Sequence, residues 1–357
     1  MEFWSTFIIT VLALEIGVIS PNVIGPMFLR RYQPDKALPW LKMSRGVSRV
    51  LPSWRGFNAV YMAAYHLQKG EYGEALVHAE VGVKETSKSG HRELMRQSAK
   101  FYLGIALLRH GEFAQAEAIL TELQKTRIFS SPKSQAVLEA QRGVIATNQG
   151  RFQEASTIFK KYLAEATPGS VPHVSVLCSL SLCAYYEGDL AQALDLAQQA
   201  VKKPSTLLWL DAGGRSCQMV YLVEMGELTQ AQEIEAWLLS HLQELPPTTK
   251  AGAMRAIAQL ALKNGDLDRA RNYAEQAYPL DPNPNTHASA LLIQAEVFAT
   301  RKNPRRVQDI CGEIQRLNAL DFYKTRAQKL LQSLESPSLP SFSHLEEAPE
   351  MQSVLLG

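Results

Sequence analysis

The sequence lacks the motifs that mark an enzyme. Its 357 residues contain no glycine-rich phosphate loop, no dinucleotide fingerprint after a strand, no paired-histidine zincin motif and no nucleophile elbow. The four cysteines include no CxxC pair, and the eight histidines are scattered without ligand spacing. We therefore expect no catalytic site, no metal site and no cofactor.

Charge of one sign is also scarce, since the formal net charge is only +2. Residues 1–55 carry seven bases and three acids, a balance of +4, while residues 336–357 carry three acids and no base. The remainder is therefore +1, and no broad basic face is indicated. A nucleic-acid partner is not expected, nor is a small-molecule substrate.

Only one long hydrophobic run is present, the seventeen residues 3–19 with Glu15 as their single charge. A helix of this length spans about 26 Å, close to the roughly 30 Å of a hydrocarbon core. Ten Phe, Ile, Leu or Val residues favour insertion by about 3 to 6 kcal/mol, against about 3 kcal/mol for a central carboxylate. We predict a single-pass anchor within residues 3–29.

The bases that follow this run set the predicted topology. Seven of them lie between residues 30 and 55, so the positive-inside rule places the rest of the chain in the cytoplasm. Two alternatives stay open: a cleaved signal with an exported, periplasmic protein, and a soluble protein. Glu15 either pairs with another membrane helix or is tolerated near the interface. The bases themselves either contact anionic lipid or only fix the topology.

What the sequence has in plenty is an internal repeat. A glycine is followed five residues later by an alanine six times, at intervals of 41, 39, 38, 38 and 39 residues. A glycine suits the left-handed end of one helix, and an alanine lets a second helix pack closely against the first. The position seven residues before each glycine is small in five of six cases. The six pairs are Gly70/Ala75, Gly111/Ala116, Gly150/Ala155, Gly188/Ala193, Gly226/Ala231 and Gly265/Ala270.

This frame resembles the tetratricopeptide repeat (TPR). The clearest unit matches the family pattern with Ala258, Gly265, Ala270, Ala274, Ala277 and Pro282. A degenerate seventh unit fits Ala295, Lys302, Val307, Cys311 and Ile314. Residues 321–335 would form a capping helix whose polar outer face consists of Lys324, Arg326, Gln328, Lys329 and Gln332. The resemblance implies an all-α, right-handed solenoid of helical hairpins, here preceded by a single transmembrane helix.

The predicted organisation has four parts. Residues 1–29 form the anchor, and residues 30–55 form a basic membrane-proximal segment or a capping half-repeat in which Ala37, Leu41 and Ser44 keep the spacing of a second repeat helix. Residues 56–335 form an array of about seven helix pairs with the capping helix. Residues 336–357, rich in proline and serine with an acidic cluster, form a disordered tail.

The resemblance also implies a concave groove lined by the first helix of each pair. The front half of this groove is apolar and aromatic. The back half, to which later units contribute Ser216, Glu224, Arg255 and Gln259, is more charged. The family's carboxylate clamp is not met, because Ala64, Ile105 and Val144 stand where it needs asparagine. The predicted groove residues are Phe57, Val60, Leu67, Phe101, Ile105, Leu108, Val144, Asn148, Leu182, Tyr185 and Tyr186.

An apolar groove suits an amphipathic helix or an extended apolar segment. We therefore expect a membrane-anchored scaffold or assembly factor that binds an unidentified protein partner and performs no chemistry. The alternative function is that of an exported repeat protein in envelope biogenesis. Neighbouring repeats or the chain's own tail, which ends in Val354, Leu355 and Leu356, could instead bury the groove residues.

Overall fold

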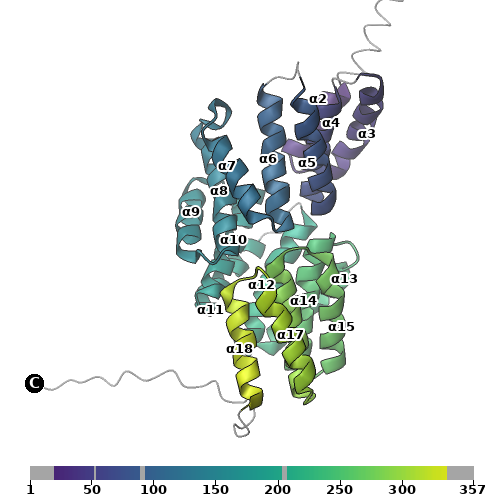
Figure 1. Ribbon diagram of the computed structural model, residues 1–357. Coiled ribbons are helices and arrows are strands. Elements are labelled where there is room, and N and C mark those ends of the chain that lie inside the picture. Colours follow the sequence, from purple (N-terminus) through teal and green to yellow (C-terminus); the bar gives the residue numbers. More distant parts are fainter. Residues whose placement is uncertain (1–19, 52–53, 89–92, 203–206, 336–357) are drawn as a thin grey trace, which may run out of the picture.

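The computed structural model describes residues 20–51, 54–88, 93–202 and 207–335. Within these ranges the chain is helical and contains no β-strand. Consecutive helices pair through tight turns, and the pairs stack into a curved array (Figure 1). The prediction of an all-α repeat solenoid is confirmed.

The array begins with α2 and ends with α18. Its α-helices are α2 (Ser20–Arg30), α3 (Pro34–Val50), α4 (Arg55–Lys69), α5 (Tyr72–Thr86), α6 (Glu93–His110), α7 (Phe113–Gln124), α8 (Pro132–Asn148), α9 (Phe152–Glu165), α10 (Val171–Tyr186), α11 (Leu190–Val201), α12 (Leu208–Glu224), α13 (Leu228–His241), α14 (Pro247–Lys263), α15 (Leu267–Ala277), α16 (Pro284–Thr300), α17 (Pro304–Arg316) and α18 (Asp321–Glu335), with short 3₁₀ turns η3 (Arg127–Phe129) and η4 (Tyr278–Leu280).

The turn inside each pair explains the repeated glycine. All six frame glycines have a left-handed backbone, with φ between 71° and 93°. A residue with a Cβ pays about 1 kcal/mol or more in this conformation, so glycine is favoured. Lys302, at the glycine position of the predicted seventh unit, also has positive φ, 55°. The degenerate unit therefore keeps the turn without the glycine.

The array contains an eighth helix pair, α2/α3. It precedes the six glycine-marked pairs and the degenerate seventh pair. Tyr32, between α2 and α3, has φ 53°, and Ala37 follows it by five residues as alanine follows each frame glycine. Gly25 lies seven residues before Tyr32, at the small-residue position of the repeat. A Cβ on Gly25 would lie 3.1 Å from Cδ2 of Leu41. Ala37 and Leu41 are fully buried. Residues 20–50 thus form a complete helix pair rather than a half-repeat.

The α2/α3 pair includes residues that were predicted to lie in the membrane anchor. The anchor predicted for residues 1–29 overlaps α2, which packs against α3 and α4. No helix in the described part of the chain is long and apolar enough to cross a membrane. The run at residues 3–19, on which that prediction depends, lies outside the described residues, as does the predicted disordered tail at 336–357.

Small residues let the helices of a pair approach closely. A Cβ on Gly143 of α8 would lie 2.7 Å from Cε1 of Phe159 on α9, whose ring is fully buried. In the α4/α5 pair the same contact is made by Ala63, Ala75 and Ala79, all with no exposed surface. The core is accordingly a chain of small clusters between neighbouring pairs, as expected for a repeat array.

The array curves until helices five pairs apart touch. A Cβ on Gly70, after α4, would lie 2.9 Å from Cγ of Pro246 beside α14, and Thr248 donates a hydrogen bond to the Gly70 carbonyl at 3.3 Å. A Cβ on Gly111, after α6, would lie 2.9 Å from Cδ of Pro284 on α16. A Cβ on Gly150, after α8, would lie 3.5 Å from Cδ2 of Leu320 before α18, at van der Waals distance. Three successive turns therefore meet three successive helix starts and close the superhelix.

The last helix, α18, packs against α16 and α17 as the predicted cap (Figure 1). Three of its predicted outer residues, Gln328, Lys329 and Gln332, are exposed. The prediction was wrong for Arg326, which turns inward to Glu224 and Glu296, at 3.0 and 3.6 Å. The cap therefore also forms part of the concave side.

Candidate functional site

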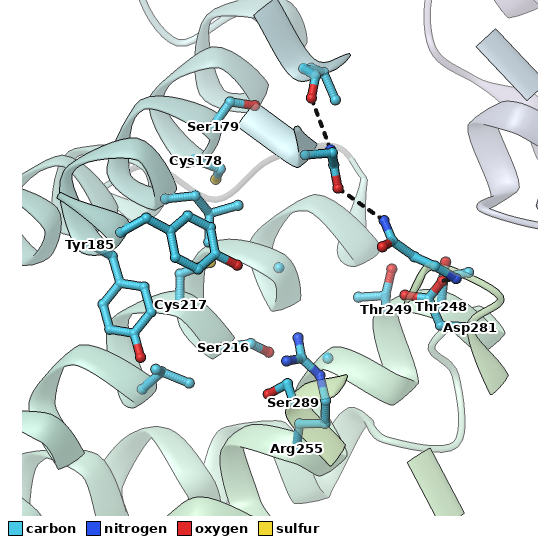
Figure 2. A pocket seen from close by; sticks show the side chains of 18 of the residues that line it. Cys178, Ser179, Tyr185, Ser216, Cys217, Thr248, Thr249, Arg255, Asp281 and Ser289 are labelled. Atoms are coloured by element: carbon cyan, nitrogen blue, oxygen red, sulfur yellow. Dashed lines mark hydrogen bonds between the residues drawn. The ribbon is translucent and has the colours of Figure 1, made fainter. Parts of the chain in front are cut away.

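A cavity of about 350 Å³ lies inside the closed superhelix. Its wall comes mainly from the first helices of successive pairs, α8, α10, α12, α14 and α16, and from α18. Closure brings these helices around one space, so the cavity depends on the contacts between distant turns. Figure 2 shows labelled residues from α10, α12, α14 and α16 directed toward it.

One wall of the cavity is aromatic. Tyr185 and Tyr186, at the end of α10, pack with ring centroids 5.4 Å apart, and the Tyr186 hydroxyl lies 3.0 Å from that of Tyr323 on α18. Burial raises the pKa of both Tyr185 and Tyr186, so their hydroxyls stay neutral. This wall offers apolar ring surface with neutral hydrogen-bonding groups.

Two thiols line the same side. Cys178 and Cys217 both face the cavity (Figure 2), and all four cysteines of the chain are free. Burial raises the pKa of each of these two thiols. They are therefore protonated at neutral pH and act as small hydrophobic groups, not as nucleophiles.

Two arginines of the cavity differ in their ion pairs: Arg326 is paired with carboxylates, and Arg255 is not paired within the described part of the chain. Arg326 is held by Glu224 and Glu296, as described above, and burial raises the pKa of the Glu296 carboxyl. Arg255 of α14 has no carboxylate within ion-pair distance anywhere in the described ranges, and its buried Nε has no hydrogen-bond partner there. In Figure 2 its guanidinium points into the open space near Ser216 and Ser289. Arg255 thus presents an uncompensated positive charge to a ligand.

Two asparagines that line the cavity, Asn148 and Asn283, form a hydrogen-bonded set with Asn285, which we call the asparagine clasp. Oδ1 of Asn148, on α8, accepts hydrogen bonds from Nδ2 of Asn283 at 3.1 Å and from Nδ2 of Asn285 at 3.2 Å. Oδ1 of Asn285 in turn accepts from the backbone N–H of Leu320 at 2.8 Å. The clasp joins three parts of the array that are far apart in sequence.

The structure brings six of the eleven predicted groove residues to this cavity. They are Leu108, Val144, Asn148, Leu182, Tyr185 and Tyr186. The other five do not line it. Val60 is buried and would contact a Cβ on Gly82 of α5 at 3.2 Å, and Leu67 packs in the cluster around Ala63.

The remaining three lie on the N-terminal part of the array. Phe57 packs against Tyr61, with ring centroids 4.7 Å apart, and Phe101 packs against Phe129 at 5.5 Å. Ile105 is half-buried on α6. These positions share the repeat frame of the cavity residues but are not part of the lining of this cavity, and the frame alone does not distinguish the two groups.

Several cavity residues were not identified from the sequence. Thr248 and Thr249 at the start of α14 and Asp281 before α16 lie where the frame assigns no groove position, and Ser289 lies on α16 in the degenerate seventh unit, for which no groove residue was predicted (Figure 2). They reach the cavity because these helix starts meet the turns of earlier repeats. The only available signal was the pair of prolines, Pro246 and Pro284, at those starts.

The expectation that the histidines are scattered also needs a correction. His66 on α4 and His78 on α5 lie with their rings stacked, 5.1 Å between centroids, beside Glu74. A separation of twelve residues is not a ligand spacing on one helix. The helical hairpin nevertheless brings the two histidines together.

Comparison with protein families identifies tetratricopeptide repeats at residues 101–171 and 252–304. The chain therefore carries such repeats, in agreement with the resemblance of its glycine and alanine frame. Comparison with curated proteins gives no match.

Solved structures share the fold at low sequence identity. The quorum sensor NprR in complex with its cognate peptide NprX has a TM-score of 0.51 at 15% identity, over 75% of this chain and 82% of that one. The apo form of NprR from B. thuringiensis gives 0.50 at 12% identity, over 88% and 86%. The human IFIT1 dimer with m7Gppp-AAAA gives 0.51 at 15% identity, over 87% and 70%. These likenesses concern the fold alone.

Proposed function

We propose that this array of tetratricopeptide repeats is a protein-interaction scaffold that binds a short protein segment in its internal cavity and performs no chemistry. The observation that carries the proposal is the unpaired Arg255 in a cavity with an aromatic wall. A segment with apolar side chains and one carboxylate would satisfy both features, because the rings accept apolar groups and the guanidinium accepts an anion.

The size and lining of the cavity support a peptide ligand. About 350 Å³ is at the small end of ligand pockets, so it would hold a few residues rather than a whole helix. The hydroxyls of Ser216 and Ser289 and the amides of Asn148 and Asn283 line the cavity and can bond to a peptide backbone. The structure of NprR contains a cognate peptide, NprX, and its fold resembles this one.

A nucleic-acid ligand is the second candidate, since IFIT1 was solved with m7Gppp-AAAA. The charges of the cavity argue against it. Three arginines line the space, Arg109, Arg255 and Arg326, but Asp281 and Glu296 also line it, which leaves a balance of +1. Nucleic-acid affinity grows with the number of phosphates neutralised, and this cavity could neutralise few.

The proposal is tested by filling the cavity. Gly252 of α14 lines it, and a Cβ there would meet no atom within 4 Å. Gly252→Trp therefore places an indole in the cavity without a backbone clash, whereas Gly252→Ala leaves nearly all of the space. Gly73→Trp, at an exposed site on α5 where a Cβ also meets no atom, controls for a surface indole.

Peptides would be selected from a phage-displayed random library on the full-length chain in detergent, and their affinity measured by fluorescence anisotropy. We expect Gly252→Trp to weaken a selected peptide at least about a hundredfold, and the two controls to leave it within about twofold. Arg255→Gln should weaken acidic peptides by about ten- to a hundredfold, the equivalent of one charge-assisted hydrogen bond. Equal binding by the wild type and Gly252→Trp would refute the proposal.

We further propose that the array is held at a membrane by the apolar run at residues 3–19 and faces the cytoplasm. Residues 20–29 of the predicted anchor belong to α2, which packs on the array. The apolar run and the bases after it support this, as argued from the sequence. Since α2 begins at Ser20 and packs on the array, a membrane helix ending there would join the array without a linker. Export to the cell envelope is the alternative.

A C-terminal reporter that is active only in the cytoplasm, combined with cell fractionation, separates these cases. Activity in the membrane fraction is the expected result. An inactive reporter on an exported chain would overturn the topology and favour a role in envelope biogenesis.

A further inference from the structure

The first complete glycine-marked hairpin, α4/α5, gathers three metal-ligating side chains. One ring nitrogen of His66, one of His78 and a carboxylate oxygen of Glu74 all lie within 4.8 Å of one another. Glu74 and His78 are four residues apart on α5 and so share a face, and His66 reaches them from the last turn of α4. Nothing in the peptide-binding proposal uses these residues.

A fourth residue orients the cluster. Oε2 of Glu71 lies 2.6 Å from Nδ1 of His66. An ionised carboxylate only accepts hydrogen bonds, so Nδ1 of a neutral His66 donates and its Nε2 keeps the lone pair that a metal needs. A carboxylate on the far nitrogen of a histidine ligand is the usual support of a protein metal site.

The local charges permit a cation. Two carboxylates, Glu71 and Glu74, balance the charge of a divalent ion. Arg45 is the cation near His78 that opposes binding.

We propose that His66, Glu74 and His78 form a Zn²⁺ site, with Glu71 as a positioning residue and water as the fourth ligand. Bonds of about 2.0 to 2.2 Å in a tetrahedron place ligand atoms about 3.3 to 3.6 Å apart. The present separations are at most 4.8 Å, so shifts of about 1.5 Å suffice, and Glu74 is exposed and free to make them.

One ring must also turn. The two imidazoles are stacked with 7° between their planes, so their in-plane lone pairs lie in nearly parallel planes and do not converge on one ion. Rotation of one ring about its terminal torsion, which has a broad energy minimum, lets both lone pairs converge. Metal binding would then tie the end of α4 to the start of α5, next to Gly70, where the superhelix closes on Pro246.

The experiment is a titration of the full-length protein, prepared without a polyhistidine tag and stripped with EDTA, with ZnCl₂ in a calorimeter. We expect one Zn²⁺ per chain. His66→Gln and His78→Gln should each weaken binding more than about tenfold, and Glu71→Gln by about ten- to a hundredfold, because it only removes the orienting charge. His110→Gln, on α6 outside the cluster, is the matched control and should change nothing.

Circular dichroism of each variant shows whether the helices are intact. If a single histidine variant does not fold, Glu71→Gln still tests the site, because its side chain keeps the shape of the native one. Unchanged affinity in a folded His66→Gln, His78→Gln double variant would overturn the proposal. So would a wild-type protein that takes up no stoichiometric Zn²⁺.

Discussion

The asparagine clasp should control the closure of the superhelix, and Asn285→Ala is the perturbation that tests this. Asn285 is buried, with 6% of its surface exposed. Its amide donates to Oδ1 and to the backbone oxygen of Asn148, at 3.2 and 3.3 Å, and its carbonyl accepts from the Leu320 N–H. One side chain therefore connects the third glycine-marked pair, the last pair and the cap.

The cost of its removal can be worked out from these contacts. The two bonds to Asn148 share one amide and contribute about 1 kcal/mol together. The Leu320 N–H lies in a buried position and makes no other hydrogen bond within the described residues, so its loss of a partner costs about 1 to 3 kcal/mol. We expect Asn285→Ala to destabilise the closed form by about 2 to 4 kcal/mol, with the lower value if water enters the vacated space.

Two measurements check this expectation. Hydrogen exchange should speed up at the start of α16 and at the start of α18, and X-ray scattering should report a larger radius of gyration as the ends separate. Asn272→Ala, at an exposed position on α15, is the control and should behave as the wild type. If Asn285→Ala exchanges and scatters as the wild type does, the clasp does not hold the superhelix closed.

Two further substitutions test the packing and the charges. Gly143→Ala should lower the free energy of unfolding, measured in urea, by about 1 to 2 kcal/mol, because its methyl group would lie 2.7 Å from the Phe159 ring. Gly312→Ala, where a Cβ meets no atom within 4 Å, should raise it by about 0.5 to 1 kcal/mol. Equal effects would contradict this account of helix pairing. Burial raises the pKa of Glu296 although Arg326 opposes the shift. The folded protein therefore favours the protonated carboxyl, and this contribution to the free energy of unfolding is lost as the pH rises through the raised pKa. Glu296→Gln should therefore gain stability relative to the wild type between pH 4 and pH 7, and a constant difference in urea midpoint would refute the assignment.

The local structure of the repeat was predictable because each frame residue acts on its nearest neighbours. A glycine at Gly70 or Gly265 ends one helix, and the alanine five residues later sets the approach of the next. The same local logic found the seventh unit around Lys302, although lysine replaces glycine there. It did not find the α2/α3 pair as a complete unit, because Tyr32 hides the glycine position and apolar residues before it suggested a membrane segment.

The closure of the array could not be predicted in this way. It is the sum of small rotations between successive pairs, and those rotations depend on side-chain packing that a repeat frame does not specify. The frame therefore gives Tyr185 and Phe101 comparable groove positions, yet only Tyr185 lines the cavity. The inward turn of Arg326 has the same origin, since α18 meets Glu224 only in the closed form.

Closure also has a consequence for binding. Contacts between distant turns, such as the one between Gly70 and Pro246, assemble the cavity that Arg255 lines. The site in which Arg255 lacks an ion-pair partner among the described residues therefore depends on closure. A ligand that bonds to Arg255 and to the clasp residue Asn148 would stabilise the closed form relative to an open one by its difference in affinity for the two. Conversely, Asn285→Ala should weaken peptide binding in proportion to the closed population it removes. A clasp variant that opens the array but binds a selected peptide with unchanged affinity would separate the binding site from the closure, and would place the peptide outside this cavity.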